Sequence, residues 1–426
     1  MTRMPNWQTV TLALLIFIPL CGATPEIWQD TKAYLRFDPV RPPLYPIFLW
    51  LFHVFGAYQF TMMMWVQALL NFFGLLYAYH WLSRRLALPS FFIFLILILT
   101  TIIFFLHFRM LINMLSEALA FPLFIVTFTL LVDNFQTIDL KKISILMLVG
   151  NLLILTREQF YYFYILFAAL IIWHYWKHIP LKKIVQGASI VVLSILLTAM
   201  LNRSYHYFIS HYFQASSATG LVLIPQALYL SRLEDANYFK NENEKKIFTA
   251  VMTQLENLKL TRQYPPIYLN PPLTLEAADD YFNIACIPII GVLQKNFPLG
   301  LTSYEGSQLL VNISKTLYLN NVKKNMVFYL WRIAAMMGGI GIFLAFALIL
   351  FSMGIRILFD RTWDPSVKQI FIVMSFLTIL ANAALLGFSS RYEIRYFYYS
   401  YFLYFCLSGL LVKEFFTKKI NEPTIV

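Results

Sequence analysis

The run FFIFLILILTTIIFFL, residues 91–106, decides the class of this chain because it contains neither a charged residue nor a proline. It approaches the roughly 20 apolar residues with which a helix crosses ~30 Å of hydrocarbon, and it is too long for an ordinary buried strand. Strands of a membrane barrel would alternate apolar and polar residues, which this run does not. We therefore expect a membrane-crossing helix here.

Similar runs recur along the 426 residues, which are 59% hydrophobic, 18% aromatic and only 13% charged. This composition, with a mean hydropathy of +0.65, excludes a water-soluble globular protein. The sequence predicts an all-α polytopic membrane protein with about ten transmembrane helices. The expected spans are residues 7–20, 60–82, 91–106, 111–132, 143–155, 160–176, 184–201, 326–350, 370–388 and 397–412.

Lysine and arginine in the short loops set the orientation, because cytoplasmic loops carry an excess of these residues. With the N-terminus inside, the pairs Arg84-Arg85, Lys141-Lys142 and Lys182-Lys183 all lie on the cytoplasmic side. We expect a multi-pass protein of the cell inner (cytoplasmic) membrane with both termini in the cytoplasm. Compact inside loops favour a bacterial membrane, with the endoplasmic reticulum as the alternative. The net charge of +12 is then partly a signal that orients the helices in the membrane, and no motif indicates a nucleic-acid partner.

One long stretch between the seventh and eighth expected spans breaks the hydrophobic pattern and lies outside in this orientation. We expect an N-terminal transmembrane module at 1–204 of about seven helices, whose first outer loop is 22–59. A small, mostly helical extracytoplasmic domain follows at 205–325, since about 120 residues suffice for such a domain. A C-terminal transmembrane module of about three helices completes the chain at 326–426.

Four arginines lie at the outer ends of different expected spans, against the usual positive-inside bias: Arg109, Arg157, Arg391 and Arg395. If the helices converge there, these side chains surround one cavity and bind a phosphate, which the planar guanidinium pairs bidentately. In the alternative interpretation each arginine extends to lipid headgroups, with Glu158 and Glu393 as local partners.

Glu117 is the sharpest intramembrane charge, because the expected span 111–132 places it about two turns inside the apolar region. An ionisable residue at that depth faces protein or water and indicates a functional site. A protonated or arginine-paired structural carboxylate is the alternative, and a proton-coupled transporter would use such a residue too.

The first outer loop carries an unpaired carboxylate, Asp30, followed by the motif Arg41-Pro42-Pro43-Leu44-Tyr45-Pro46. Prolines fix φ and remove backbone donors, so this motif gives a stiff entry into a short apolar helix at 47–55, which we expect in the interface. A simple helix start is the alternative. Near the last outer loop, Tyr392 belongs to an aromatic cluster that either contacts sugar and lipid or forms an interfacial belt.

Taken in order, Asp30, the Arg-Pro-Pro-Leu-Tyr-Pro motif, Ser116-Glu117, an outer Arg157 and the late Arg391-Tyr392 and Arg395-Tyr396 resemble the GT-C superfamily. Its members are glycosyltransferases that use polyprenyl-phosphate-linked sugars, such as protein mannosyltransferases and lipid A aminoarabinose transferases. The resemblance covers most of the membrane portion but not the domain at 205–324.

The resemblance implies that Asp30 is the catalytic base, with Asp38 in reserve, although Asp38 before Pro39 also reads as a turn former. Arg41, Tyr45, Arg109, Glu117, Arg157, Arg391, Tyr392 and Arg395 become candidates for substrate binding. Many relatives carry an adjacent acidic pair where this chain has Asp30-Thr31, which speaks against a metal-bridged mechanism. No cofactor is implied and no metal ligand is assigned, while a divalent metal stays open.

The expected function is therefore inverting transfer of a sugar from a polyprenyl-phosphate donor, within the membrane lipid, to an envelope acceptor on the extracytoplasmic face. A transporter or lipid flippase is the alternative, although the sequence has no repeat between its halves. A non-catalytic assembly subunit is a third interpretation.

Overall fold

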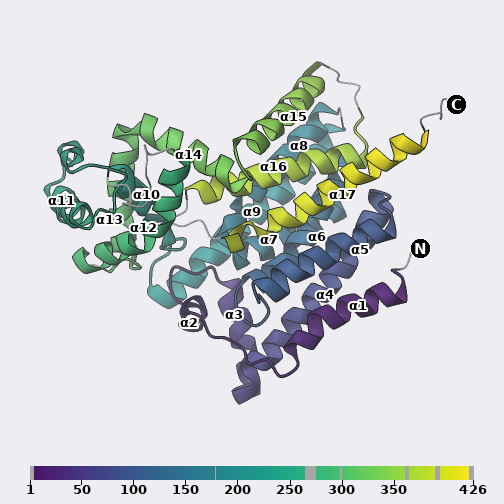
Figure 1. The fold of residues 1–426 in the computed structure, drawn as a ribbon, viewed down its shortest axis with the longest axis horizontal. Helices are drawn as coiled ribbons and strands as arrows, with labels where there is room; N and C mark the ends of the chain where they lie inside the picture. Colours follow the sequence, from purple (N-terminus) through teal and green to yellow (C-terminus); the bar gives the residue numbers. More distant parts are fainter. Residues whose placement is uncertain are drawn as a thin grey trace.

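The computed structural model describes residues 4–177, 179–263, 275–297, 300–359, 364–388 and 394–421, and every regular element in these ranges is helical (Figure 1). The first half contains α1 (Asn6–Phe17), η1 (Ile18–Leu20), α2 (Gln29–Leu35), α3 (Leu44–Leu51), η2 (Phe52–Tyr58), α4 (Gln59–Arg85), α5 (Ser90–Thr101), η3 (Ile102–His107), α6 (Glu117–Gln136), α7 (Leu140–Thr156), η4 (Glu158–Tyr161), α8 (Tyr162–Trp176) and α9 (Leu181–Ser210). The second half contains α10 (Ala218–Leu230), η5 (Leu233–Tyr238), α11 (Glu242–Asn257), α12 (Leu275–Asn296), α13 (Tyr304–Asn320), α14 (Val322–Met336), α15 (Ile340–Phe359), α16 (Val367–Gly387), η6 (Ile394–Phe397) and α17 (Tyr398–Asn421).

Five helical segments of the described chain are long and apolar enough to cross a membrane: Leu44–Arg85, Ser90–His107, Glu117–Gln136, Leu181–Ser210 and Val367–Gly387. The pair α14 and α15 makes a sixth if it is counted as one span. These helices support a multi-pass membrane protein, with fewer spans by this measure than the ten expected. The expected spans 7–20, 143–155, 160–176 and 397–412 fall on α1, α7, α8 and α17, which are not among the five.

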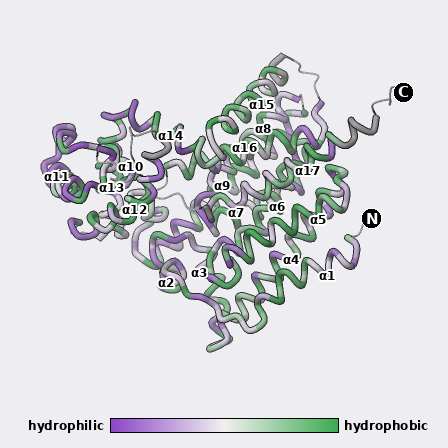
Figure 2. The backbone as a smooth tube through the Cα atoms, in the orientation of Figure 1, coloured by the Kyte–Doolittle hydropathy of each residue, from purple (hydrophilic) through white to green (hydrophobic). Residues whose placement is uncertain are grey.

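These helices contain long apolar stretches, drawn green along the tube in Figure 2. Many of their apolar side chains are exposed. On α9, for example, Leu193 and Leu197 are 65% and 58% exposed. A helix in water would turn such residues inward, whereas lipid solvates them without cost. The exposed faces therefore support the membrane environment that composition predicts.

The expected span at 326–350 is not one continuous helix in the structure, because α14 and α15 meet at an angle of 92°. The break lies at Gly338 and Gly339, whose φ angles of +100° and +109° belong to a region that residues with a Cβ adopt only under strain. Two consecutive glycines thus let the chain turn sharply where hydropathy alone suggests a continuous helix.

The central helix α6 contains Pro122, which has no N–H and therefore leaves the carbonyl of Ala118 without its helical donor. Asn71 of α4 supplies the missing bond, its Nδ2 donating to the Ala118 oxygen at 2.7 Å. Gly74, one turn further along α4, lets the two helices approach, since a Cβ there would lie 2.9 Å from the Cβ of Pro122. The α4–α6 contact is built on these three positions.

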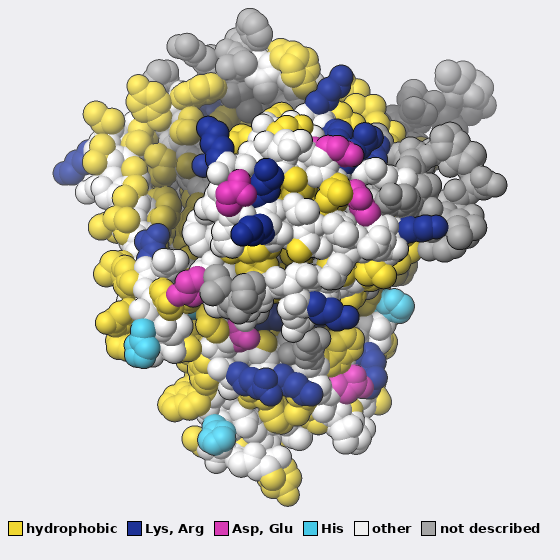
Figure 3. Space-filling view, turned by 90° about the vertical axis from the view of Figure 1, so that its left-hand side faces the viewer, with side chains coloured by type: hydrophobic (Ala, Val, Ile, Leu, Met, Phe, Trp, Pro, Cys, Tyr) yellow, Lys and Arg dark blue, Asp and Glu magenta, His cyan; other side chains and the backbone are white. Residues whose placement is uncertain are grey.

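Residues 205–325 contribute most of a second buried apolar cluster, separate from that of the membrane helices. Its members come mainly from α10, α11, α12 and α13, with Phe328 of α14 and, from connecting segments, Phe239, Phe297 and Leu301. In Figure 1 these helices lie to one side of the long helices, and the start of α1 and the end of α17 lie at the opposite side. We call α10–α13 the outer helical unit. Seen from its own side in Figure 3, the molecule shows basic and acidic side chains intermixed, with hydrophobic side chains gathered along one flank.

Candidate functional site

The site begins at α2, a short helix in the first loop that is tied to the segment before α6. The hydroxyl of Thr31 accepts a hydrogen bond from Trp28 N–H at 3.1 Å and donates to the carbonyl of Met114, also at 3.1 Å. The hydroxyl of Tyr34, one turn later, lies 2.9 Å from the hydroxyl of Ser116. These bonds place Asp30, in the first turn of α2, beside the N-terminus of α6.

Asp30 bridges two arginines that are far apart in the sequence. Its Oδ1 accepts a hydrogen bond from Arg41 Nη2 at 2.5 Å, and its Oδ2 accepts one from Arg395 Nη2 at 2.8 Å. The interpretation of Asp30 as an unpaired carboxylate is therefore wrong: the fold brings it to Arg41, later in the same loop, and to Arg395 of η6.

Glu117 forms the second half of this arrangement. Its Oε2 lies 2.6 Å from Nη1 of Arg157, and its Oε1 lies 3.8 Å from Nε of Arg395. Arg395 thus faces both carboxylates. We call Asp30, Arg41, Glu117, Arg157 and Arg395 the charged network.

The expected depth of Glu117, two turns inside a span, is wrong because the helix begins only at this residue. The preceding segment is held in a non-helical path, with Arg109 and Met114 at φ angles of +50° and +45°. The carbonyls that a helix would use are taken by other donors, including Asn113 Nδ2 on Phe108 O at 3.0 Å. Glu117 is therefore an N-terminal residue, where the helix dipole favours a negative charge.

Ser116, Tyr396 and Tyr34 complete the network; the sequence motifs included Ser116 and Tyr396, whereas Tyr34 was not among the candidates. Ser116 accepts a hydrogen bond from Arg157 Nη1 at 3.0 Å. The Tyr396 ring lies 5.0 Å from the guanidinium groups of both Arg157 and Arg395, and the Tyr34 ring lies 4.9 Å from that of Arg41. The sequence signals were the hydroxyl directly before Glu117 and the tyrosine directly after Arg395.

The network carries three positive and two negative charges, and its side chains are mostly shielded from solvent, with exposures of 2% for Glu117 and 13% for Arg157. Burial by itself would raise the pKa of Asp30, but the charges and hydrogen bonds of Arg41 and Arg395 outweigh it and hold that pKa below its usual value. Asp30 is therefore ionised at neutral pH, and the network keeps one positive charge in excess for an anion.

The structure separates some predicted site residues from the network. Arg109 is half-exposed and pairs with Glu26 at 2.6 Å. Tyr45 is fully buried beneath Tyr34, with ring centroids 4.8 Å apart, and its hydroxyl accepts a hydrogen bond from Gln67. Tyr45 thus packs behind Tyr34, whose ring contacts Arg41, and does not itself belong to the network. Arg391 and Tyr392 lie outside the described residues, while Asp38 caps a turn by accepting a hydrogen bond from Val40 N–H.

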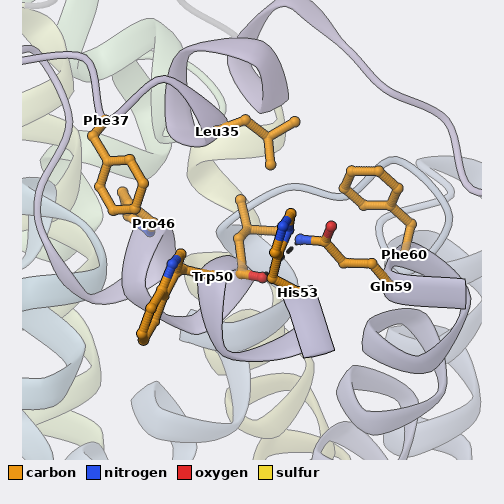
Figure 4. Close-up of a pocket in the computed structure, with 8 residues that line it drawn as sticks. Leu35, Phe37, Pro46, Trp50, His53, Gln59 and Phe60 are labelled. Atoms are coloured by element: carbon orange, nitrogen blue, oxygen red, sulfur yellow. Dashed lines mark hydrogen bonds between the residues drawn. The ribbon is translucent and has the colours of Figure 1, made fainter. Parts of the chain in front are cut away.

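A hollow of about 290 Å³ opens between the end of α2, α3 and the start of α4 (Figure 4). Its lining is largely apolar, and Gln59 donates a hydrogen bond from Nε2 to Leu49 O at 2.9 Å, the dashed bond of the figure. The lining residues are Leu35, Phe37, Pro46, Leu49, Trp50, His53, Gln59 and Phe60. The hollow lies on the same two helices that carry Asp30 and Tyr45, so apolar space is available close to the charged network.

Within the described ranges, no group of three or more His, Cys, Asp or Glu side chains is placed to hold a metal ion. The charged network itself offers arginines, carboxylates and the Ser116 hydroxyl. Comparison with family models, with curated proteins and with solved structures gives no match to this chain.

Proposed function

We propose that this protein is an integral-membrane inverting glycosyltransferase that moves a sugar from a polyprenyl-phosphate donor to a cell-envelope acceptor on the extracytoplasmic face. The observation that carries the proposal is the bridging of Asp30 by Arg41 and Arg395, with Arg395 also facing Glu117. A carboxylate and several arginines in one partly buried place are what such a transfer needs.

In the proposed reaction an acceptor hydroxyl gives its proton to Asp30 while its oxygen attacks the anomeric carbon. The bond between that carbon and the phosphate oxygen breaks, and the leaving polyprenyl phosphate keeps the electron pair. Arginines stabilise the charge of this phosphate, because guanidinium groups pair with oxyanions through two parallel N–H bonds. One carboxylate then serves the acceptor and the cations serve the donor.

Without substrate, the same arginines donate hydrogen bonds to Asp30, which lowers its ability to accept a proton. A donor phosphate that engages Arg395 and Arg41 competes with Asp30 for their N–H groups. As those bonds pass to the phosphate, the pKa of Asp30 rises toward its ordinary value and the carboxylate becomes a better proton acceptor. Donor binding thereby activates the base.

Glu117 and Arg157 act as positioning residues in this proposal. Glu117 is almost fully buried and faces both Arg157 and Arg395, so it fixes the two guanidinium groups relative to the first loop. Preorganised charges of this kind stabilise a transition state without reorganisation during the reaction.

The test combines a binding experiment and an activity experiment. Purified protein is titrated with polyprenyl phosphate, and we expect Arg395→Met to weaken binding at least about 10-fold while Arg109→Met, outside the network, leaves it unchanged. Membranes supplied with radiolabelled polyprenyl-phosphate sugars should show transfer that Asp30→Asn abolishes with normal folding. Undiminished transfer in Asp30→Asn would end the assignment.

Transport is the second candidate, and one observation favours it: the 92° break between α14 and α15. Broken helices often line the substrate path of transporters. Glu117 no longer adds to this case, since it is arginine-paired at a helix N-terminus. Uptake of a labelled lipid or sugar into sealed vesicles, unaffected by Asp30→Asn, would favour transport over transfer.

A further inference from the structure

Glu158 directly follows Arg157 in the sequence, yet its carboxylate belongs to a different group of side chains from the charged network. Asn202 of α9 and Ser216, in the segment between α9 and α10, lie close enough to Glu158 to lower the pKa of its carboxylate. Among the described residues, no lysine, arginine or histidine forms an ion pair with it, and its Oε1 is buried without a hydrogen bond. A buried carboxylate without a cation is costly and calls for an explanation.

Other polar atoms on α9, the helix that carries Asn202, share this unsatisfied character. His206 lies one turn after Asn202 on α9, is 0% exposed, and neither of its ring nitrogens makes a hydrogen bond within the described chain. The carbonyl oxygen of Asn202 is likewise buried without a donor, although its Nδ2 lies 3.3 Å from the hydroxyl of Tyr161. Most of these atoms accept hydrogen bonds, so a ligand that satisfies them must donate.

Aromatic rings surround the same place. The ring of Tyr205 lies 5.1 Å from that of His206, which lies 6.3 Å from that of Tyr304 on α13. Tyr212 continues the series at 4.8 Å from Tyr304, and Phe37 of the first loop lies 6.4 Å from Tyr205. Aromatic faces beside a carboxylate attract a cation more strongly than either group alone.

The place is a junction of several segments. Ser217 N–H donates to Pro39 O of the first loop at 3.1 Å, and the Ser217 hydroxyl donates to Thr302 O at 2.7 Å, just before α13. The first loop, α9 and the outer helical unit therefore meet here. Phe37 and Tyr205 are partly exposed and Tyr212 is 39% exposed, so part of this aromatic group lies at the protein surface.

We propose that Glu158, Asn202 and His206, enclosed by the rings of Tyr205 and Tyr304, bind a primary ammonium group. The ammonium has three N–H donors and one positive charge, which match the unsatisfied acceptors and the uncompensated carboxylate. The source of the ammonium is either a soluble amine such as an amino sugar or the ethanolamine headgroup of a lipid. This site goes beyond the proposed transfer reaction and does not depend on it.

Binding should depend on pH because the carboxylate must be ionised. Burial raises the pKa of Glu158 to about 7 despite the hydrogen bonds from Asn202 and Ser216. The other titratable or charged groups nearby are Tyr161 in η4, Arg203, Tyr205 and His206 in α9, Tyr304 in α13 and Asp38 in the first loop. An ammonium ligand should therefore bind more tightly as the pH rises through about 7.

The experiment measures the thermal midpoint of the full-length detergent-solubilised protein against concentration of glucosamine, with glucose as the uncharged control. A second arm compares phosphatidylethanolamine with phosphatidylcholine in mixed micelles. We expect a saturable rise with at least one primary amine and none with glucose; whichever arm responds identifies the source. Glu158→Gln should weaken the response at least about 10-fold, and His206→Phe, which keeps a ring, should weaken it too.

The matched control is Glu242→Gln, an exposed residue at the start of α11. It should respond like the wild type. The proposal is overturned if neither amine has an effect, or if Glu158→Gln responds as the wild type does. Polyprenyl phosphate binding is measured on the same Glu158→Gln protein and should be unchanged; its absence in the wild type would count against the transferase alone.

Discussion

Arg395 donates a hydrogen bond from Nη2 to Oδ2 of Asp30 at 2.8 Å, although 365 positions of sequence separate the two residues. The same guanidinium faces Glu117, so one side chain from the end of the chain joins the first loop to the start of α6. This relationship makes Arg395 the residue of the network whose chemistry is most easily tested.

Arg395→Lys should weaken polyprenyl phosphate binding about 10-fold. Lysine keeps the charge but presents a point-like ammonium, which cannot span two carboxylates and a phosphate with a planar fork. A titration at constant salt measures the effect, since exposed charges are screened. Arg109→Lys is the matched control and should change affinity little, because Arg109 pairs with Glu26 instead. Equal losses in both variants would contradict a specific role of Arg395.

Glu117→Gln should destabilise the protein by about 3 kcal/mol, because removing one partner of a buried pair leaves the other charge uncompensated. Glu117 is only 2% exposed and faces two arginines. Unfolding in detergent, followed by circular dichroism, gives the difference. Asp133→Asn breaks the more exposed pair with Arg85 and should cost less than about 1 kcal/mol. If Glu117→Gln lowers the free energy of unfolding less than Asp133→Asn does, the buried carboxylate is not needed for stability.

Stability should fall as the pH rises from about 4.5, the ordinary pKa of glutamate, to about 7, the pKa of Glu158 in the folded protein. In this window the folded state holds a proton that the unfolded state releases, so raising the pH favours unfolding. The loss levels off above about 7 and is at most on the order of 3 kcal/mol.

Glu158→Gln should remove this part of the pH dependence and be more stable than the wild type at pH 8, when both are measured without amines. Thermal midpoints over a pH series provide the comparison. A wild-type slope that persists in Glu158→Gln would assign the pH dependence to another group.

Gly220→Ala should destabilise the outer helical unit by about 1–3 kcal/mol. A Cβ at Gly220 would lie 2.3 Å from the backbone oxygen of Ser307, so α10 and α13 would have to move apart. The N–H of Gly220, which donates to the Ser307 hydroxyl at 3.2 Å, would be displaced as well. Hydrogen exchange of α10 and α13 should report the loosening.

Gly291→Ala provides the control on α12, because nothing lies within 4 Å of a Cβ at that position. Alanine there should stabilise the helix by about 0.5–1 kcal/mol. A destabilisation equal to that of Gly220→Ala would show that glycine flexibility, and not close packing, is what matters in this unit.

Composition and apolar runs determined that this chain is helical and suited to a membrane, since hydrophobicity is a local property that 20 or so neighbouring residues express together. They also made Asp30, Arg157 and Arg395 candidate site residues, because placing a charged side chain in an apolar environment costs free energy. Composition and apolar runs did not predict the bend at Gly338-Gly339 or the late start of α6. The bend depends on the positive φ angles of the two glycines, and the late start of α6 depends on non-helical hydrogen bonds such as that between Thr31 and Met114.

Which charges meet was decided only by the tertiary structure. The sequence offered four outer arginines as equals, yet packing pairs Arg109 with Glu26 and brings Arg157 and Arg395 to Glu117. Local patterns carry no information on distances between residues hundreds of positions apart. Such contacts follow from how helices pack, and the low polarity of the interior then makes each buried charge depend on the partner that packing provides.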